Sequence, residues 1–225
     1  MFVRALKNVE SRIEAACTRA DRRREEITLI AVTKTQHPPT INEALGHGVT
    51  DIGENRVQEY LGKRDELELH RFHMIGALQS NKVRQIISIV DMIHSVDRMS
   101  LAKEIEKRAG RIPRIVPCLI EVNTSGEESK EGCAPDDVEQ LVEAIAKFEH
   151  IDIRGLMTVA EYVQDPEDVR PSFRLLRELG ERIKPILGSP EKLELSMGMT
   201  NDFEIAIEEG ATMIRIGSAL FGPRT

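Results

Sequence analysis

Lys34 follows a short run of β-branched and apolar residues, residues 27–33, that is typical of a buried strand. A lysine at the end of such a strand would carry its amine to the edge where strands of a parallel sheet end. A desolvated amine near other cations loses its proton more readily and can attack a carbonyl carbon to form a Schiff base. The alternative is a lysine whose ammonium group reaches out to water. The position alone leaves both interpretations open.

Two later segments could together bind an anion. Residues 196–200, Ser-Met-Gly-Met-Thr, precede an expected helix with Thr200 at its N-cap, and residues 217–218, Gly-Ser, follow the last expected strand. Backbone N–H groups at a helix N-terminus point toward an anion, and the helix dipole favours negative charge. Thr200 could be an ordinary N-cap, and Gly217 could be an ordinary turn glycine. Their occurrence in two neighbouring loops, where barrels often bind phosphate, favours a phosphate site that also includes Ser218.

Arg215 lies at the end of the last expected strand. It could be a salt-bridged arginine inside the fold. It could also place a permanent cation and hydrogen-bond donor beside Lys34, if the first and last strands are neighbours in a closed barrel.

These side chains require strands whose carboxyl ends meet. Eight short apolar segments alternate with helical patterns, and a periodic pattern in residues 2–16 adds an opening helix. The expected strands are residues 27–33, 49–52, 72–75, 92–95, 115–122, 153–158, 193–196 and 212–216. This alternation predicts an α/β fold, a single (β/α)8 TIM barrel with an extra N-terminal helix. An open doubly wound sheet is the alternative, but no Gly-x-Gly-x-x-Gly follows the first strand.

Residues with capping or helix-breaking preferences mark the expected helix ends. We expect a capping box at Thr40 and Glu43, a cap at Asp97, first helical positions at Pro135 and at Pro166 behind Asp165, and helix C-termini at Gly110, Gly180 and Gly210. The basic run at residues 22–24 is flanked by acidic residues, which indicates a solvated helix end.

The composition excludes several classes of protein. The 225 residues are 40% hydrophobic and 31% charged, which suits one core, and we expect a single domain over residues 1–225. A net charge of −7 disfavours nucleic acid as a partner. No apolar segment is long enough to cross a bilayer, and the first seven residues are too charged for a secretory signal. The three cysteines lack Cys-x-x-Cys spacing, so we expect no metal site and a cytoplasmic protein.

Seven sequence blocks, in this order, resemble the pyridoxal phosphate homeostasis proteins, which are alanine-racemase N-terminal-domain-like. They are Ala-Val-Thr-Lys at 31–34, Gly-Glu-Asn-Arg-Val-Gln-Glu at 53–59, His-Met-Ile-Gly-Ala-Leu-Gln-Ser-Asn-Lys at 73–82, Asn-Thr-Ser-Gly-Glu at 123–127, Gly-Leu-Met-Thr at 155–158, Leu-Ser-Met-Gly-Met-Thr at 195–200 and Arg-Ile-Gly-Ser-Ala-Leu-Phe-Gly at 215–222. The resemblance extends from about residue 27 to residue 222.

The resemblance implies a cofactor and a set of contacts. Lys34 matches the lysine that holds pyridoxal 5′-phosphate as an internal aldimine, and Arg215 matches the arginine that faces its pyridine nitrogen. The remaining matches are Thr200, Gly217 and Ser218 for the phosphate, with Ser196 nearby, and Asn55 along the cofactor. Relatives usually carry serine at the position of Thr200, and the hydroxyl is retained here.

The resemblance implies a protein that binds, buffers and delivers the cofactor, with apo-enzymes as recipients. We expect a monomer and assign no catalytic residue. The alternatives are a slow alanine-type racemase and, more weakly, a Schiff-base aldolase. Alanine racemases use a tyrosine from an additional β domain of a partner subunit, whereas this chain ends at Thr225, just after the expected barrel. We expect Tyr60 and Tyr162 to pack on helix or loop surfaces, which leaves His73 or Cys133 as weaker substitutes.

Overall fold

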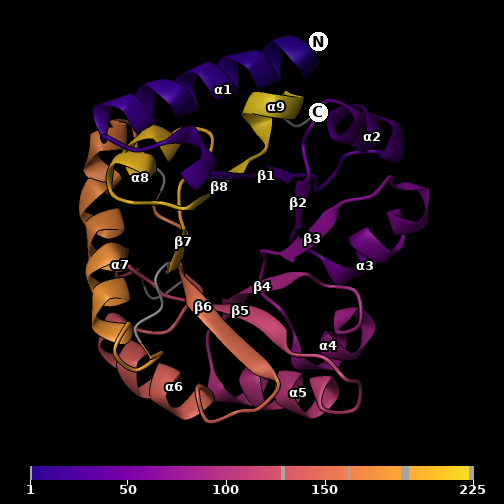
Figure 1. Ribbon diagram of the computed structural model, residues 1–225, viewed down its shortest axis with the longest axis vertical. Coiled ribbons are helices and arrows are strands. Elements are labelled where there is room, and N and C mark those ends of the chain that lie inside the picture. The colour runs from indigo at the N-terminus through magenta and orange to yellow at the C-terminus, as the bar shows by residue number, and fades with distance from the viewer. Residues whose placement is uncertain (1, 128–129, 162, 189–192, 223–225) are drawn as a thin grey trace.

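The computed structural model describes residues 2–127, 130–161, 163–188 and 193–222. Eight parallel strands close into a barrel in sequence order, with β8 beside β1 (Figure 1). The strands are β1 Thr28–Val32, β2 Asp51–Glu54, β3 Arg71–Met74, β4 Met92–Val96, β5 Val116–Glu121, β6 Ile151–Met157, β7 Glu194–Ser196 and β8 Met213–Ile216. Each lies within about two residues of its expected position, so the predicted barrel is confirmed and the open sheet is excluded.

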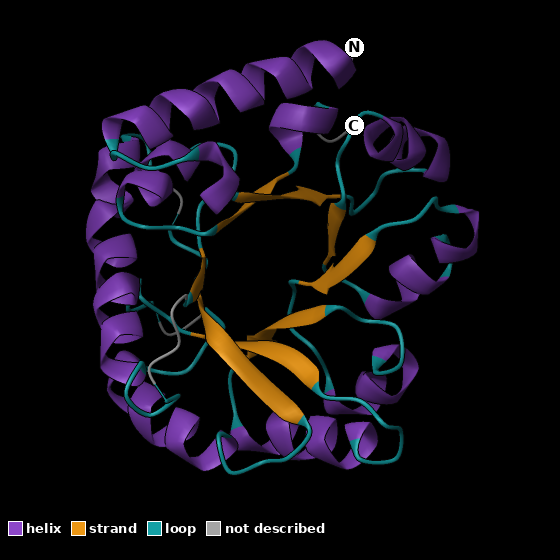
Figure 2. Cartoon of the chain, in the orientation of Figure 1, coloured by secondary structure: helices purple, strands orange, loops and turns teal. Residues whose placement is uncertain are grey.

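Helices form a ring outside the strands (Figure 2). They are α1 Phe2–Arg19, α2 Pro38–Gly46, α3 Val57–Leu61, α4 Ser80–Ile86, α5 Met99–Ala109, α6 Val138–Ile145, α7 Arg170–Ile183, α8 Phe203–Glu208 and α9 Ser218–Phe221. Four short 3-10 turns lie at Arg24–Glu26, Arg64–Glu66, Pro135–Asp137 and Pro166–Val169. The expected extra helix is α1, which packs across α8 and α9 and so covers the side of the barrel where β8 meets β1.

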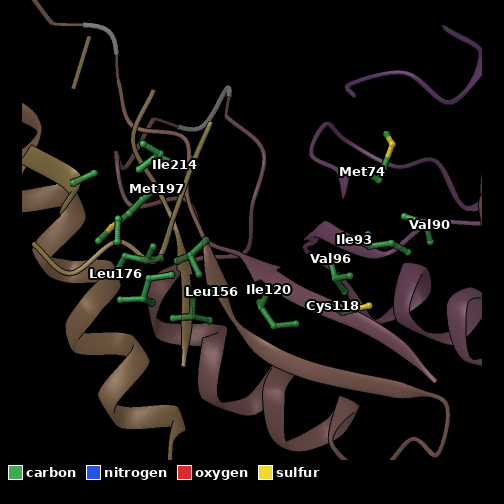
Figure 3. Packing of buried hydrophobic residues seen from close by; sticks show 14 of the residues in the cluster. Met74, Val90, Ile93, Val96, Cys118, Ile120, Leu156, Leu176, Met197 and Ile214 are labelled. Atoms are coloured by element: carbon green, nitrogen blue, oxygen red, sulfur yellow. The ribbon is translucent and has the colours of Figure 1, made fainter. Parts of the chain in front are cut away.

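Two apolar regions stabilise the barrel, because parallel strands are buried on both faces. The larger one fills the space between strands and helices, as Ile120, Leu156 and Leu176 illustrate (Figure 3). The smaller one lies inside the barrel and consists of Ile30, Leu119, Met157 and Met213. A polar group buried beside this inner cluster therefore needs a hydrogen-bond partner.

Several helix ends differ from the sequence prediction. α2 begins at Pro38 with His37 as N-cap, because two prolines preset the helical φ angle, so Thr40 lies inside the helix. The N-cap of α5 is Arg98, and Asp97 pairs with Arg98 instead of capping. Gly180 lies inside α7 and is not its end. A Cβ there would approach Leu193 Cδ2 to 2.9 Å, so glycine allows close packing against the sheet.

Other predicted ends are confirmed. Asp165 caps the turn that begins at Pro166, by accepting from the Glu167 N–H, and Gly110 is the C-cap of α5. Pro135 occupies an early position of its 3-10 turn, and Gly210 follows α8 with a φ of 100°.

The basic run at residues 22–24 is not a solvated helix end, since α1 ends at Arg19. Arg22 donates to the carbonyl oxygens of Ile207 and Ala211, and Arg24 pairs with Glu10. Arg23 alone of the three has a largely exposed side chain, at 81%. Arg22 and Arg24 therefore hold the barrel bottom and α1 together. None of the helices in the described ranges is both long and apolar enough to cross a membrane.

Candidate functional site

Lys34 and four other predicted residues line one cavity of about 220 Å3 at the carboxyl end of the barrel. The others are Thr200, Arg215, Gly217 and Ser218. The pairing of β1 with β8 brings them together, since it places Ile30 opposite Arg215 and Ala31 opposite Ile216. Residues that are distant in sequence thus meet because the barrel closes.

Gly217 provides space in this cavity. Its φ of −114° does not demand glycine, and an added Cβ would only touch Val32 at an ordinary 3.5 Å. The fold itself therefore tolerates a side chain at Gly217. The missing side chain instead leaves the backbone open to a ligand in the cavity.

Two hydroxyl groups meet beside Gly217. Thr200 Oγ1 and Ser218 Oγ lie 3.2 Å apart, and the Ala219 N–H donates to Thr200 Oγ1 at 3.3 Å. Thr200 is not the N-cap of α8, because Asp202 occupies that position and accepts from the Met199 N–H at 2.6 Å. The Thr200 hydroxyl therefore does not cap α8, and together with the Ser218 hydroxyl it can face an anionic group.

Arg215 lies under the cavity and is only 4% exposed. It donates to Ser196 Oγ through Nη1 and to the Thr158 carbonyl oxygen through Nη2, both at 2.7 Å. It forms no ion pair with a carboxylate in the described part of the chain, so it is not a salt-bridged structural arginine. Burial lowers its pKa to about 10, while Glu121 and Asp202 act in the opposite direction. It therefore remains a cation at neutral pH.

The other two predicted residues lie outside this cavity. Ser196 is fully buried below it, bonded to Arg215 and to His94 Nδ1. Asn55 lines an adjacent cavity of about 620 Å3, together with Arg56 and Lys82. Its Oδ1 is buried and has no hydrogen-bond partner among the described residues. The structure thus groups five of the seven predicted residues, with Asn55 beside them and Ser196 beneath.

The side chains considered as substitute acid–base groups lie elsewhere. His73 is buried and bonded to Asp51 and His94, and burial raises the pKa of Cys133 to about 12. The expectation that Tyr60 packs on the surface is wrong. It is 4% exposed, stacks on Phe72 and shares a hydrogen bond with His70. Tyr162 lies outside the described residues.

Sequence reasoning missed an ion cluster that holds the loop of Lys34. We call it the Lys63 cluster, and it consists of Lys63, Glu54 and Glu59. Lys63 Nζ lies 2.7 Å from Glu54 Oε1 and donates to the carbonyl oxygen of Thr33 at 2.8 Å.

The two carboxylates of the Lys63 cluster also bind this loop. Glu54 accepts from the Thr33 hydroxyl, and Glu59 accepts from the Thr35 N–H. Thr35 adopts a φ of 66°, which is unusual for a β-branched residue. The cluster therefore fixes the residues on both sides of Lys34. The four-residue spacing of Glu59 and Lys63 was the available sequence signal.

Comparison with known proteins agrees with this geometry. The family model "Alanine racemase, N-terminal domain" matches residues 5–225. A pyridoxal phosphate homeostasis protein of Aquifex aeolicus is 45% identical over 222 residues, which cover 97% of this chain and 96% of the relative. A crystal structure of an unknown protein from Bifidobacterium adolescentis is 39% identical with a TM-score of 0.92, over 98% of this chain and 94% of that chain.

A structure with the cofactor is also similar. PipY of Synechococcus elongatus with pyridoxal phosphate (PLP) bound is 32% identical with a TM-score of 0.82, over 94% of this chain and 100% of that chain. The shared barrel, the full-length match to the family model and the identity to curated relatives agree with one another. The chain therefore belongs to the alanine racemase N-terminal domain family and, within it, to the pyridoxal phosphate homeostasis proteins.

Proposed function

We propose that this protein binds pyridoxal 5′-phosphate in the cavity at the barrel mouth and takes part in homeostasis of that cofactor, by binding, buffering and delivering it. The observation that carries the proposal is the meeting of Lys34, Arg215, Gly217 and the two hydroxyls in one cavity. The names of the relatives and the cofactor bound to PipY support it. Residues 1–225 would act as one domain, in the cytoplasm.

The residues present fit the chemistry of this cofactor. Thr200 and Ser218 would donate to the phosphate, which approaches over Gly217 where no side chain intervenes. Arg215 would face the pyridine nitrogen from below, and Asn55, whose Oδ1 lacks a partner, would lie along the ring. When bound, the cofactor would supply an aldehyde, and the Lys34 amine would hold it covalently through a C=N bond with release of one water.

Arg215 and the absence of a placed acid–base partner among the described residues favour a carrier over an enzyme. A guanidinium can only donate, so a ring nitrogen that accepts from it stays unprotonated. The ring then withdraws electrons less strongly, which disfavours transaminase-type chemistry. Tyr60 is enclosed between helix and strand, and His73 is occupied by two partners, so neither supplies the second acid–base group of a racemase.

The absorption spectrum tests the cofactor and its lysine. We expect purified protein with added pyridoxal phosphate to show a visible band that Lys34→Ala removes. Lys82→Ala is the matched control, because it deletes a lysine from the adjacent cavity and should keep the band. A band that persists in Lys34→Ala, or that is absent from the wild type, would contradict the proposal.

Delivery is tested separately from binding. We expect the loaded protein, which we propose to be a monomer, to transfer cofactor to an apo-enzyme faster than it releases cofactor to buffer. Equal rates would argue against a carrier. Release of the α-deuteron of alanine at a rate above that of free cofactor would favour the racemase alternative.

A further inference from the structure

A row of buried polar side chains crosses the barrel interior beneath Arg215. We call it the interior relay, and it consists of Asp51 on β2, His73 on β3, His94 on β4 and Ser196 on β7. The hydrogen bonds measure 2.8 Å from His73 Nε2 to Asp51 Oδ1, 2.9 Å from His73 Nδ1 to His94 Nε2, and 3.0 Å from His94 Nδ1 to Ser196 Oγ. Arg215 Nη1 adds the last bond, to Ser196 Oγ at 2.7 Å.

The interior relay is buried, and apolar side chains lie around it. Each of its four residues is at most about 4% exposed, and the neighbouring interior side chains are apolar: Ile30, Leu119, Met157 and Met213. An unpaired polar group in such a place costs roughly 1–3 kcal/mol. The hydrogen atoms of the interior relay must therefore be arranged so that every donor finds an acceptor.

The two ends of the interior relay fix the direction of its bonds. Burial acts to raise the pKa of Asp51, but hydrogen bonds from His73 and Arg71 outweigh it and hold that pKa well below its ordinary value. Asp51 is therefore a carboxylate, which only accepts. At the other end, the Arg215 guanidinium only donates. Burial lowers the pKa of His94 well below its ordinary value, so His94 is neutral and carries one N–H.

One arrangement satisfies every group. His73 Nε2–H donates to Asp51, His94 Nε2–H donates to His73 Nδ1, and the Ser196 hydroxyl donates to His94 Nδ1. The Ser196 oxygen then accepts from Arg215. In the reverse direction, Ser196 would accept from both His94 and Arg215, and its own hydrogen would have no acceptor among the described residues.

We propose that the interior relay positions Arg215, by presenting the lone pair of Ser196 Oγ to Nη1 and so aiming the guanidinium at the cavity. The Thr158 carbonyl oxygen holds Nη2, and together the two acceptors fix the plane of the group. The role of that plane toward the pyridine nitrogen rests on the proposed function. Asp51, His73, His94 and Ser196 are positioning residues that touch no ligand themselves.

Histidine tautomers test the direction directly, without cofactor. We would record side-chain 15N chemical shifts of the ligand-free, 15N-labelled protein at pH 7. We expect the Nε2 nitrogens of His73 and His94 to carry a proton and their Nδ1 nitrogens to carry none, while the exposed His37 averages between tautomers. A proton on Nδ1 of either buried histidine would overturn the arrangement.

Two variants of Ser196 test the effect on Arg215. Ser196→Ala removes the acceptor, so binding of pyridoxal phosphate would have to order the guanidinium. We expect the dissociation constant of pyridoxal phosphate from the Ser196→Ala variant, measured by equilibrium dialysis, to rise roughly two- to tenfold. The His94 Nδ1 shift should change as well. Ser196→Thr keeps the hydroxyl and should restore both values.

The outcomes separate this inference from the proposed function. If Ser196→Ala leaves both the His94 shift and the dissociation constant unchanged, the interior relay does not position Arg215. If the wild type binds no pyridoxal phosphate, the proposed function fails, and the tautomers in the ligand-free protein still decide whether the interior relay exists as described.

Discussion

Replacing Lys63 by methionine should destabilise the protein far more than the same replacement at a lysine of an exposed ion pair. Lys63 and Glu54 are 8% and 0% exposed, and the second carboxylate oxygen of Glu54 already lacks a partner among the described residues. Methionine keeps most of the apolar stem and removes the charge. The change leaves a buried carboxylate without its counter-ion and the carbonyl oxygen of Thr33 without its donor.

The size of the expected loss in the free energy of unfolding follows from the burial of the Lys63–Glu54 pair. Removing one partner of a buried ion pair costs about 3–5 kcal/mol, whereas an exposed pair contributes about 0–1 kcal/mol. Lys184→Met is the matched control, because Lys184 pairs with Glu181 at 2.6 Å and their side chains are 32% and 63% exposed. We expect urea unfolding of cofactor-free protein to separate the two variants by at least about 2 kcal/mol.

The loss should also depend on pH. Burial raises the pKa of the Glu54 carboxyl above its ordinary value, although Lys63 and Thr33 act to lower it. Without Lys63 that pKa rises further. Between the unfolded and folded pKa values the folded state then holds a proton that the unfolded state releases, so stability falls as pH rises through that window. The loss in Lys63→Met should be larger at pH 8 than at pH 5.

A second substitution tests the same reasoning from the other side. Lys63→Met combined with Glu54→Gln removes the stranded charge and should recover part of the stability and most of the pH dependence. A Lys63→Met variant that loses no more than Lys184→Met, or that loses the same amount at both pH values, would refute the argument.

Three further predictions concern single residues. Gly198→Ala should lower the free energy of unfolding by about 2 kcal/mol or more, because Gly198 has a φ of 91° and an added Cβ would lie 2.5 Å from Ala206 Cβ. Gly217→Ala should leave urea stability within about 0.5 kcal/mol and weaken pyridoxal phosphate binding, since the fold tolerates that Cβ but the cavity would lose space. Burial raises the pKa of Glu121 to about 7. Wild-type stability should therefore fall as pH rises from about 4.5 to about 7, by up to about 3 kcal/mol, and Glu121→Gln should lack this fall in urea titrations at pH 5 and pH 8.

The strands and most cavity residues could be predicted because their signals are local. An apolar β-branched run indicates a strand wherever it occurs, and the residue after it must lie at the mouth once the barrel closes. That reasoning placed Lys34, Gly217 and Ser218 correctly at one cavity. Whether they hold the cofactor stays a prediction.

The first residues of the helices were harder to predict, because several residues near a helix start can act as its N-cap. Thr40 has the preferred side chain, yet Pro38 fixes φ two residues earlier and the helix begins there. Thr200 lost the N-cap of α8 to Asp202, whose carboxylate accepts from the Met199 N–H. Because Thr200 does not cap α8, its hydroxyl stays available to the cavity. The predicted cap was therefore wrong, but the proposed contact with the ligand is unaffected.

The supporting polar groups could not be predicted, because their partners meet only in the folded barrel. His94 and Ser196 are separated by 102 positions, and Lys63 is 30 positions from Thr33. No periodicity or spacing encodes such a pair.

The position of these groups bears on how a carrier works. The Lys63 cluster holds the backbone on both sides of Lys34, and the interior relay holds Arg215, and neither support uses a group that a ligand must supply. The two residues can therefore keep their positions when the cavity is empty, so binding requires little ordering of the protein. Since loading and unloading then need no refolding of the site, affinity can be set by the hydroxyls of Thr200 and Ser218 at the cavity, which a departing phosphate would leave without disturbing the barrel.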